Sequence, residues 1–150
     1  MATEQLDVTN QQSIKHAAGR IESLYGRPDV LVNNAGIVSV SNPPTADALR
    51  RVLDTNVVGA LGATEVLLPL LRKSSAAHFV FVSSSMGSIA HAADPDSPYC
   101  GPRATEYRVS KAALNMLITM YGVRLKPDDV LVFGADPGLC ATNFTGDPGL

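Results

Sequence analysis

Residues 78–85 read HFVFVSSS, a run of apolar and aromatic residues after one histidine that ends in three serines. Apolar side chains at successive positions, rich in β-branched and aromatic types, are typical of a strand buried on both faces, as in a parallel sheet. The serines mark the point where this strand reaches polar surroundings. The stretch therefore predicts a buried parallel strand with hydroxyl groups at its carboxyl end.

Two further runs share this pattern, DVLVNNAG at 29–36 and DVLVFGADPG at 129–138. A weaker run, QLDVT at 5–9, predicts a fourth strand at the start of the chain. Thr45 is a candidate N-cap for the second of the helical segments between these runs. Those segments are 11–25, where apolar residues recur on one helix face, 46–71, which makes one or two helices, and 105–125. Alternating strands and helices predict an α/β fold with a parallel sheet.

Composition predicts a globular protein in one domain, 1–150. Of the 150 residues, 45% are hydrophobic and 17% are charged, and the formal net charge is −2. Because no basic patch and no membrane-length apolar run occurs, we expect neither nucleic acid nor a membrane as a partner. The first residues do not resemble a secretory signal, so we expect a cytoplasmic protein. Cys100 and Cys140 have no metal-ligand spacing, and we expect no metal site.

Polar residues follow the predicted strands, where open parallel sheets bind their ligands. Tyr107 and Lys111 lie four positions apart on the following helix, so both face one side of it. A tyrosine hydroxyl ordinarily has a pKa near ~10, and a neighbouring lysine cation lowers that pKa by favouring the phenolate. A serine hydroxyl can hold a substrate oxygen while charge develops on it. Together these groups predict an acid–base site for oxidation and reduction.

Five motifs occur in order along the chain: NNAG at 33–36, NVVG at 56–59, SSSMG at 83–87, YRVSK at 107–111 and PGLCAT at 137–142. This series resembles the short-chain dehydrogenase/reductase family, and more specifically its fungal-type, carbonyl-reductase-like members. The resemblance covers Asp7 to Thr142. It implies a Rossmann-like, doubly wound parallel sheet and an NAD(P)-dependent enzyme that interconverts a carbonyl and an alcohol by hydride transfer. It also implies NADP or NAD as cofactor, with NADP slightly favoured.

The resemblance implies a catalytic tetrad. Tyr107 would be the general acid/base, and Lys111 would lower its pKa and contact the nicotinamide ribose. Ser84 matches the family serine because Gly87 follows three residues later, with Ser83 and Ser85 as alternatives, and Asn56 would hold a water beside the lysine. The implied cofactor contacts are Asp7 and Val8 at the adenine, Asn33, Ala35 and Gly36 near the adenine ribose, and Tyr107, Lys111, Pro137, Gly138 and Thr142 toward the nicotinamide.

The glycine-rich phosphate loop of the family is not found in this sequence, which contains neither GxxxGxG nor GxGxxG. QLDVT matches the third strand of the family fold, so we expect an incomplete sheet that lacks the first two strands and the last. Without the glycine loop we expect weak cofactor binding. Residues 6–8 then either stay irregular or slide into the vacant first-strand position and pair with residues 30–32, and we expect the slide.

Two other functions are compatible with the sequence. A non-catalytic remnant would act only by pairing with family members through its long helices, which also makes a homo-oligomer an alternative. The helix at 105–125 is apolar nearly all round, which favours such an interface. A serine hydrolase using Ser84 and His91 is disfavoured, because no GxSxG turn surrounds the serine. The substrate is expected to be a small carbonyl compound or alcohol, whose identity the sequence does not give.

Overall fold

The computed structural model describes residues 3–140 and Phe144. Its sheet consists of three parallel strands in the order β1 (Val30–Asn33), β2 (His78–Val82) and β3 (Leu131–Ala135). Helices connect each strand to the next, and Val32, Val80 and Phe133 lie side by side in the register. The α/β class and the three strong strand predictions are therefore confirmed.

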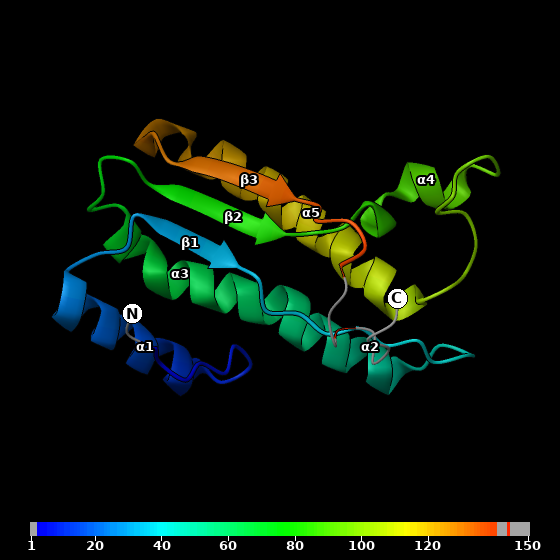
Figure 1. The fold of residues 1–150 in the computed structure, drawn as a ribbon, viewed down its shortest axis with the longest axis horizontal. Coiled ribbons are helices and arrows are strands. Elements are labelled where there is room, and N and C mark those ends of the chain that lie inside the picture. Colours follow the sequence, from blue (N-terminus) through cyan, green and yellow to red (C-terminus); the bar gives the residue numbers. More distant parts are fainter. Residues whose placement is uncertain (1–2, 141–143, 145–150) are drawn as a thin grey trace.

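The described residues contain five α-helices (Figure 1), which are α1 (Gln11–Tyr25), α2 (Ala46–Leu53), α3 (Ala60–Leu71), α4 (Ile89–Ala93) and α5 (Thr105–Leu125). The bounds of α1 and α5 are those that the apolar spacing predicts. Asn10 caps α1, since its side chain accepts from the amides of Gln12 and Ser13. Thr45 caps α2, as predicted, by accepting from the amide of Ala48 at 3.2 Å. Three short helical turns complete the list: the π-helical η1 (Asp54–Gly59) and the 3₁₀ turns η2 (Ser85–Gly87) and η3 (Lys126–Asp128).

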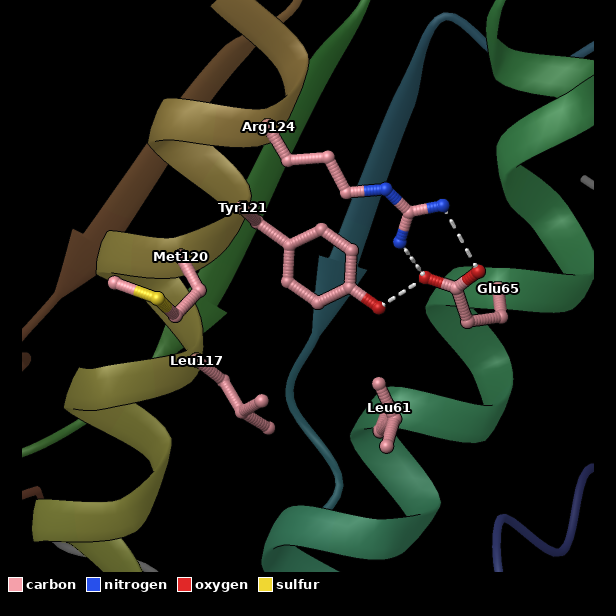
Figure 2. A pocket seen from close by; sticks show the side chains of 6 residues that line it. All are labelled: Leu61, Glu65, Leu117, Met120, Tyr121 and Arg124. Carbon is pink, nitrogen blue, oxygen red and sulfur yellow. Dashed lines mark hydrogen bonds and ion pairs between the residues drawn. The ribbon is translucent and has the colours of Figure 1, made fainter.

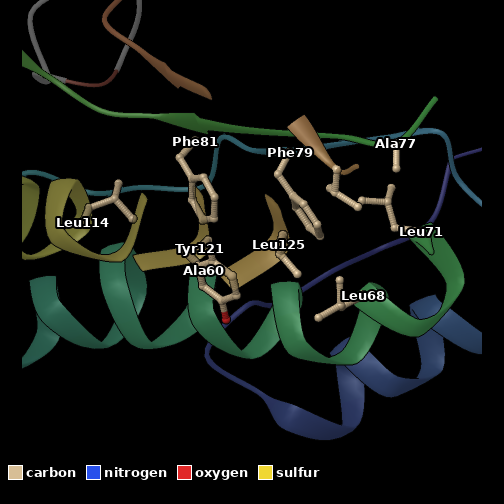
Figure 3. Close-up of a cluster of buried hydrophobic side chains, with 10 residues drawn as sticks. Ala60, Leu68, Leu71, Ala77, Phe79, Phe81, Leu114, Tyr121 and Leu125 are labelled. Atoms are coloured by element: carbon tan, nitrogen blue, oxygen red, sulfur yellow. The ribbon is translucent and has the colours of Figure 1, made fainter. Parts of the chain in front are cut away.

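One face of the sheet carries the core, because α3 and α5 pack on it (Figure 3). Phe79 and Phe81 of β2 are fully buried there and stack with Tyr121 of α5. The opposite face has no such cover among the described residues. Its side chains at Val30, Val32, Leu131 and Phe133 remain about half exposed.

The prediction of a strand at residues 5–9 is wrong, and so is the predicted slide of residues 6–8 onto β1. This segment forms the turn before α1, because the Asp7 carboxylate accepts from the amide and hydroxyl of Thr9 and its carbonyl accepts from the amide of Asn10. Val8 packs on the helical face at Gly59 instead of the sheet. A Cβ at Gly59 would lie 2.9 Å from a Val8 methyl group.

Candidate active site

The carboxyl ends of β2 and β3 meet at one edge of the sheet. Val82 lies beside Ala135, and the amide of Ser83 donates to the carbonyl of Ala135 at 2.7 Å. The chain leaves β2 through the serines and enters η2, while β3 continues into Asp136. Both segments thereby arrive beside the first half of α5, which carries Tyr107 and Lys111.

Tyr107 and Lys111 face the same side of α5, as their spacing predicts. The Lys111 ammonium lies 5.5 Å from the centre of the Tyr107 ring and donates to the carbonyl of Val82 at 2.7 Å. Hydrogen bonding by the Ser84 side chain lowers the pKa of Tyr107, against the larger opposing effect of burial. Three of the four predicted catalytic side chains are thus brought together at the end of β2.

Burial governs the protonation of this pair. The Lys111 side chain is only 4% exposed, and desolvation lowers its pKa to about 8, against the opposing charge of Asp136. Burial also raises the pKa of Tyr107, with a smaller lowering by the Ser84 hydrogen bond and a further rise from Asp136. In this structure the balance therefore favours the protonated phenol, although we expected the lysine to lower that pKa.

The three serines after β2 have different partners. The Ser83 hydroxyl donates to the amide oxygen of Asn115 on α5, and the Ser85 hydroxyl donates to the Asp136 carboxylate. Ser84 caps η2 by accepting from the amide of Met86 at 3.2 Å and is the serine that reaches Tyr107. This arrangement favours Ser84 over its two neighbours for contact with a substrate oxygen.

Gly87 allows the Ser84 turn to lie directly against α5. A Cβ at this position would lie 2.6 Å from the carbonyl carbon of Lys111, closer than side-chain and backbone atoms approach. Any side chain would push η2 away from the helix. Sequence reasoning used this glycine only to select among the serines, although a glycine within a tight turn is itself a signal of close backbone approach.

Asn56 lies in the π-helical turn η1 and is almost fully buried. Its amide nitrogen donates to the Ile37 carbonyl at 2.9 Å and to the Ser110 hydroxyl at 3.0 Å, and its oxygen accepts from the Ile37 amide at 2.8 Å. The side chain therefore ties the loop after β1 to α5, and it bonds Ser110 rather than the adjacent Lys111.

Glu106, directly before Tyr107, is a further buried residue that the sequence reasoning missed. One carboxylate oxygen accepts from the Ser41 hydroxyl and from the amide of Thr45 at 3.2 Å. The Ser41 hydrogen bond is the main cause that lowers the pKa of Glu106. These contacts fix the same loop against the first turn of α5, and only its tertiary position reveals them.

The chain matches the family model described as short chain dehydrogenase over residues 1–148. It belongs to the short-chain dehydrogenase family. Among curated proteins it is 38% identical to "Short-chain dehydrogenase anuI" of Penicillium roqueforti and 33% identical to "Short-chain dehydrogenase/reductase tropE" of Talaromyces stipitatus. The alignments cover 97% and 93% of this chain but only 60% and 57% of those relatives.

Solved structures agree with this assignment. The NADPH-bound carbonyl reductase from chicken fatty liver is 30% identical, with a TM-score of 0.82, and the match covers 95% of this chain and 59% of that one. A short-chain dehydrogenase from Streptomyces avermitilis is 32% identical, with a TM-score of 0.78, over 93% of this chain and 48% of that one. This chain thus spans about half to three fifths of these short-chain dehydrogenases and shares their Rossmann fold.

The predicted cofactor residues of this chain are less closely gathered than its predicted catalytic residues. Val8, Asn33 and Ala35 line a hollow of about 130 Å³ at the end of β1, together with Leu6 and neighbouring apolar residues. The side-chain amide of Asn33 donates to the Thr64 hydroxyl of α3 at 3.0 Å, so the Asn33 side chain points into the fold.

The remaining predicted cofactor residues lie apart from this hollow. Asp7 is exposed in its turn with Thr9. Gly36 follows the β1 end, where a Cβ would lie 3.4 Å from the amide oxygen of Asn56. Pro137 and Gly138 follow β3 beside Asp136, and the Gly138 amide donates to that carboxylate at 3.0 Å. Thr142 lies outside the described residues.

The structure pairs His91 with Ser97 and Tyr99 rather than with Ser84. The His91 Nδ1 lies 3.4 Å from the Ser97 hydroxyl, and its ring centre lies 5.8 Å from that of Tyr99. In the part of the chain that the structure describes, no His, Cys, Asp and Glu side chains gather as a metal site. Nor is any helix there both long and apolar enough to cross a bilayer.

A larger groove, of about 340 Å³, lies between α3 and α5, away from Tyr107 (Figure 2). In it, Glu65 of α3 accepts from the Tyr121 hydroxyl and from the Arg124 guanidinium, each at 2.5 Å. Burial and the Glu65 carboxylate raise the pKa of Tyr121. Leu61, Leu117 and Met120 form its apolar part. This groove belongs to the outer surface of the two long helices.

Proposed function

We propose that this protein contributes the proton-transfer half of an NAD(P)-linked oxidoreductase that interconverts a small carbonyl compound and an alcohol. The observation that carries the proposal is the position of the Lys111 ammonium, 5.5 Å from the centre of the Tyr107 ring and bonded to the Val82 carbonyl directly before the three serines. A hydroxyl acid, a second hydroxyl and a cation at a sheet's carboxyl edge are the groups that carbonyl reduction needs.

The side chains present fit the nicotinamide end of a cofactor better than its adenosine end. The Tyr107 and Ser84 hydroxyls and the Lys111 ammonium lie in the region where a nicotinamide ribose and a substrate carbonyl oxygen would need hydrogen-bond donors. The hollow at the end of β1, about 130 Å³, is smaller than the ~300–1,000 Å³ of small-molecule sites. We therefore assign Lys111, Pro137 and Gly138 to the nicotinamide end and assign no pyrophosphate donor within this chain.

In the proposed reduction, the Ser84 hydroxyl donates a hydrogen bond to the substrate carbonyl oxygen and orients it. The reduced nicotinamide supplies the hydride that the carbonyl carbon accepts. Tyr107 gives its phenolic proton to the same oxygen, which yields the alcohol, and the Lys111 cation stabilises the resulting phenolate until it regains a proton from solvent. Oxidation follows the reverse order. Asn56 acts by keeping the loop after β1 against α5.

Substitution of Tyr107 tests this assignment. A longer version of the chain that includes the family's glycine loop would be assayed with NADPH or NADH and a panel of aldehydes and ketones. Tyr107→Phe should reduce kcat by about 10²–10⁴-fold with cofactor affinity retained, while Tyr25→Phe, at an exposed helix end, serves as the matched control. Turnover by the Tyr107→Phe variant equal to that of the control would refute the proposed acid/base.

A second candidate function is pairing of the chain with another copy or a relative through α3 and α5. The favouring observation is a stripe of exposed apolar residues along α5, at Val109, Met116, Met120 and Val123, of which Met120 also lines the groove of Figure 2. Their spacing of three, four and seven places them on one face. Sedimentation of the parent chain and of a Met120→Glu, Val123→Glu double variant tests it: a dimer that the double variant loses supports pairing, and a monomeric parent excludes self-pairing.

A further inference from the structure

The first turn of α5 carries Tyr107 but has no local cap. The helix begins after Ala104, whose φ of 52° and ψ of 48° are left-handed and whose side chain makes no capping hydrogen bond. A helix start ordinarily gains a bond from a Ser, Thr, Asp or Asn side chain at this position, which alanine does not offer. The direction of the Tyr107 side chain therefore depends on contacts that this turn makes with other parts of the fold.

Glu106 provides such a contact. It is 1% exposed, and its Oε1 accepts from the Ser41 hydroxyl and from the amide of Thr45 at 3.2 Å. Thr45 is the N-cap of α2, so one carboxylate oxygen joins the start of α2 to the start of α5. Breaking these bonds would be costly, because the buried groups left behind would have neither a partner nor water.

A second buried link to the same loop reaches Tyr107 directly. Asn56 is bonded to the early part of the loop after β1 and donates to the Ser110 hydroxyl at 3.0 Å. That hydroxyl donates to the backbone carbonyl of Tyr107 at 2.7 Å. Glu106 bonds the late part of the loop. The loop thus holds the tyrosine at two points, at its own carbonyl and at the side chain of the preceding residue.

We propose that Glu106 is a positioning residue for Tyr107, which fixes the first turn of α5 against the loop between β1 and α2 through the reach of its side chain. The proposal deepens the proposed function and rests on it for its catalytic meaning. A tyrosine that transfers a proton must meet Lys111 and a substrate oxygen at the same time. A first turn free to rotate would lose this alignment even with every catalytic side chain present.

Two substitutions of Glu106 separate reach from charge. Its other carboxylate oxygen, Oε2, is buried and has no hydrogen-bond partner in the part of the chain that the structure describes. Glu106→Gln keeps the length and one acceptor oxygen and has no bond of Oε2 to lose, so both bonds to the loop should persist. Glu106→Asp keeps the charge but is shorter by one methylene group, so both bonds should be lost.

Two NMR signals of the 150-residue chain report on the link and on the tyrosine. The Thr45 amide precedes the helical ladder of α2, so its protection from hydrogen exchange reports on the bond to Glu106. The NOE between the Tyr107 ring and the Lys111 side chain reports on the tyrosine, because the ammonium lies 5.5 Å from the ring centre. Both signals need neither substrate nor cofactor.

The Glu106→Asp variant should lose both signals in part. We expect protection of the Thr45 amide to fall about ten-fold. Because the NOE falls with the sixth power of distance, a displacement of about 1 Å should weaken the Tyr107–Lys111 NOE about three-fold. Glu106→Gln should resemble the parent in both signals. Loss of both in Glu106→Gln would show that charge is what matters, and a parent-like NOE in Glu106→Asp would reduce Glu106 to a tie for the loop; either result overturns the proposal.

Two control variants exclude general effects. Glu22→Asp makes the same change in an exposed carboxylate on α1. Val130→Ala removes apolar contacts of the core at the amino end of β3, so it lowers stability at the opposite end of the sheet from Tyr107. Both should keep the parent's Thr45 protection and NOE. An NOE that weakens as much in Val130→Ala as in Glu106→Asp would overturn the specific role of Glu106.

Measurements that leave Glu106 intact cover the case in which Glu106→Asp does not fold. In the parent, the Thr45 amide should exchange about ten-fold more slowly than the first two amides of α2, and equal rates overturn the proposal. Ser41→Ala removes one of the two donors and should weaken the Tyr107–Lys111 NOE, so a parent-like NOE there also overturns it. Failure of the proposed function would appear separately, as turnover that survives Tyr107→Phe.

Discussion

The two ends of the sheet's carboxyl edge are built very differently. At the β2–β3 end, Ser84, Tyr107, Lys111 and Asp136 belong to one connected set of hydrogen bonds and charges. At the β1 end, a small hollow lies between mostly apolar side chains, and the polar Asn33 is already bonded to Thr64 inside the fold.

This difference bears on which part of the proposed chemistry this chain carries. Proton transfer needs a few side chains held by strands and a helix, and the side chains that we propose for it lie within residues 82–138. Binding a dinucleotide needs donors for the pyrophosphate, ordinarily the amides of a glycine loop at a helix N-terminus. Since the 150 residues contain no such loop, the two halves of the edge can be separated by experiment.

The largest expected effect concerns cofactor affinity. The 150-residue chain should bind NADPH or NADH more weakly, by several kcal/mol, than a longer version with the glycine loop, because charge-assisted bonds to the phosphates are lost. Isothermal titration calorimetry of both proteins measures this difference. Micromolar binding by the 150-residue chain would show that the β1 end can bind the cofactor without a glycine loop.

Gly87→Ala should affect the β2–β3 end strongly. The new methyl group would lie 2.6 Å from the Lys111 backbone, so the Ser84 turn must move, at a cost of about 3 kcal/mol of unfolding free energy. Urea denaturation measures the cost. The matched control is Gly122→Ala on α5, where no atom lies within 4 Å of the added carbon and about 1 kcal/mol of stabilisation is expected. Equal behaviour of both variants would contradict the close packing.

The buried Lys111 makes stability depend on pH in a definite direction. Its pKa falls from 10.5 to about 8 on folding, so between these values the unfolded chain binds more protons and stability rises with pH. Lys111→Met lacks this titration. The parent should therefore gain about 1–2 kcal/mol relative to that variant as pH rises from about 8 to 10.5, allowing for partial screening. If denaturant unfolding gave the parent and Lys111→Met parallel profiles of unfolding free energy against pH, burial of the Lys111 ammonium would be contradicted.

The smallest expected effect is at the β1 end. Val8→Ala removes two methyl groups that pack on Gly59 at a half-buried position, and we expect a loss of about 1 kcal/mol. The exposed Val40 offers the control, since Val40→Ala should change stability by less than about 0.5 kcal/mol. Thermal unfolding of both variants measures the difference, and a Val8 effect as large as that of Gly87→Ala would remove the contrast between the two ends.

Local patterns predicted most of the fold. The apolar runs located β1, β2 and β3, and the spacing of apolar residues gave the bounds of α1 and α5. The prediction of a strand at residues 5–9 failed because the Asp7 side chain forms a hydrogen bond with the backbone of a turn. Such a local bond competes with strand pairing. The i, i+4 rule placed Tyr107 with Lys111.

Long-range contacts were beyond sequence reasoning. Three adjacent serines look alike in the sequence, and only the packing of η2 on α5 distinguishes Ser84 from its neighbours. The sequence pattern assigned no role to Asp136, because its bond to Ser85 depends on the register between β2 and β3. The sequence suggested that Asn56 would hold a water beside the lysine, which stays a prediction, but its bonds to Ile37 and Ser110 depend on where the loop after β1 lies and could not be predicted.

The π-helical turn η1 also sets the rotational phase of the helix that follows it. A π turn accommodates one more residue than an α turn, and each residue of a regular helix turns the chain by about 100°. The wider turn absorbs this surplus residue, so α3 keeps the rotational phase that an uninterrupted α-helix would give it with one residue fewer. Val52 before η1 and Leu68 and Leu71 after it are therefore all buried. If Asp54–Gly59 closed as regular α turns with all of its residues kept, α3 would be rotated against α2 by more than a quarter turn, and Leu68 and Leu71 would leave the sheet.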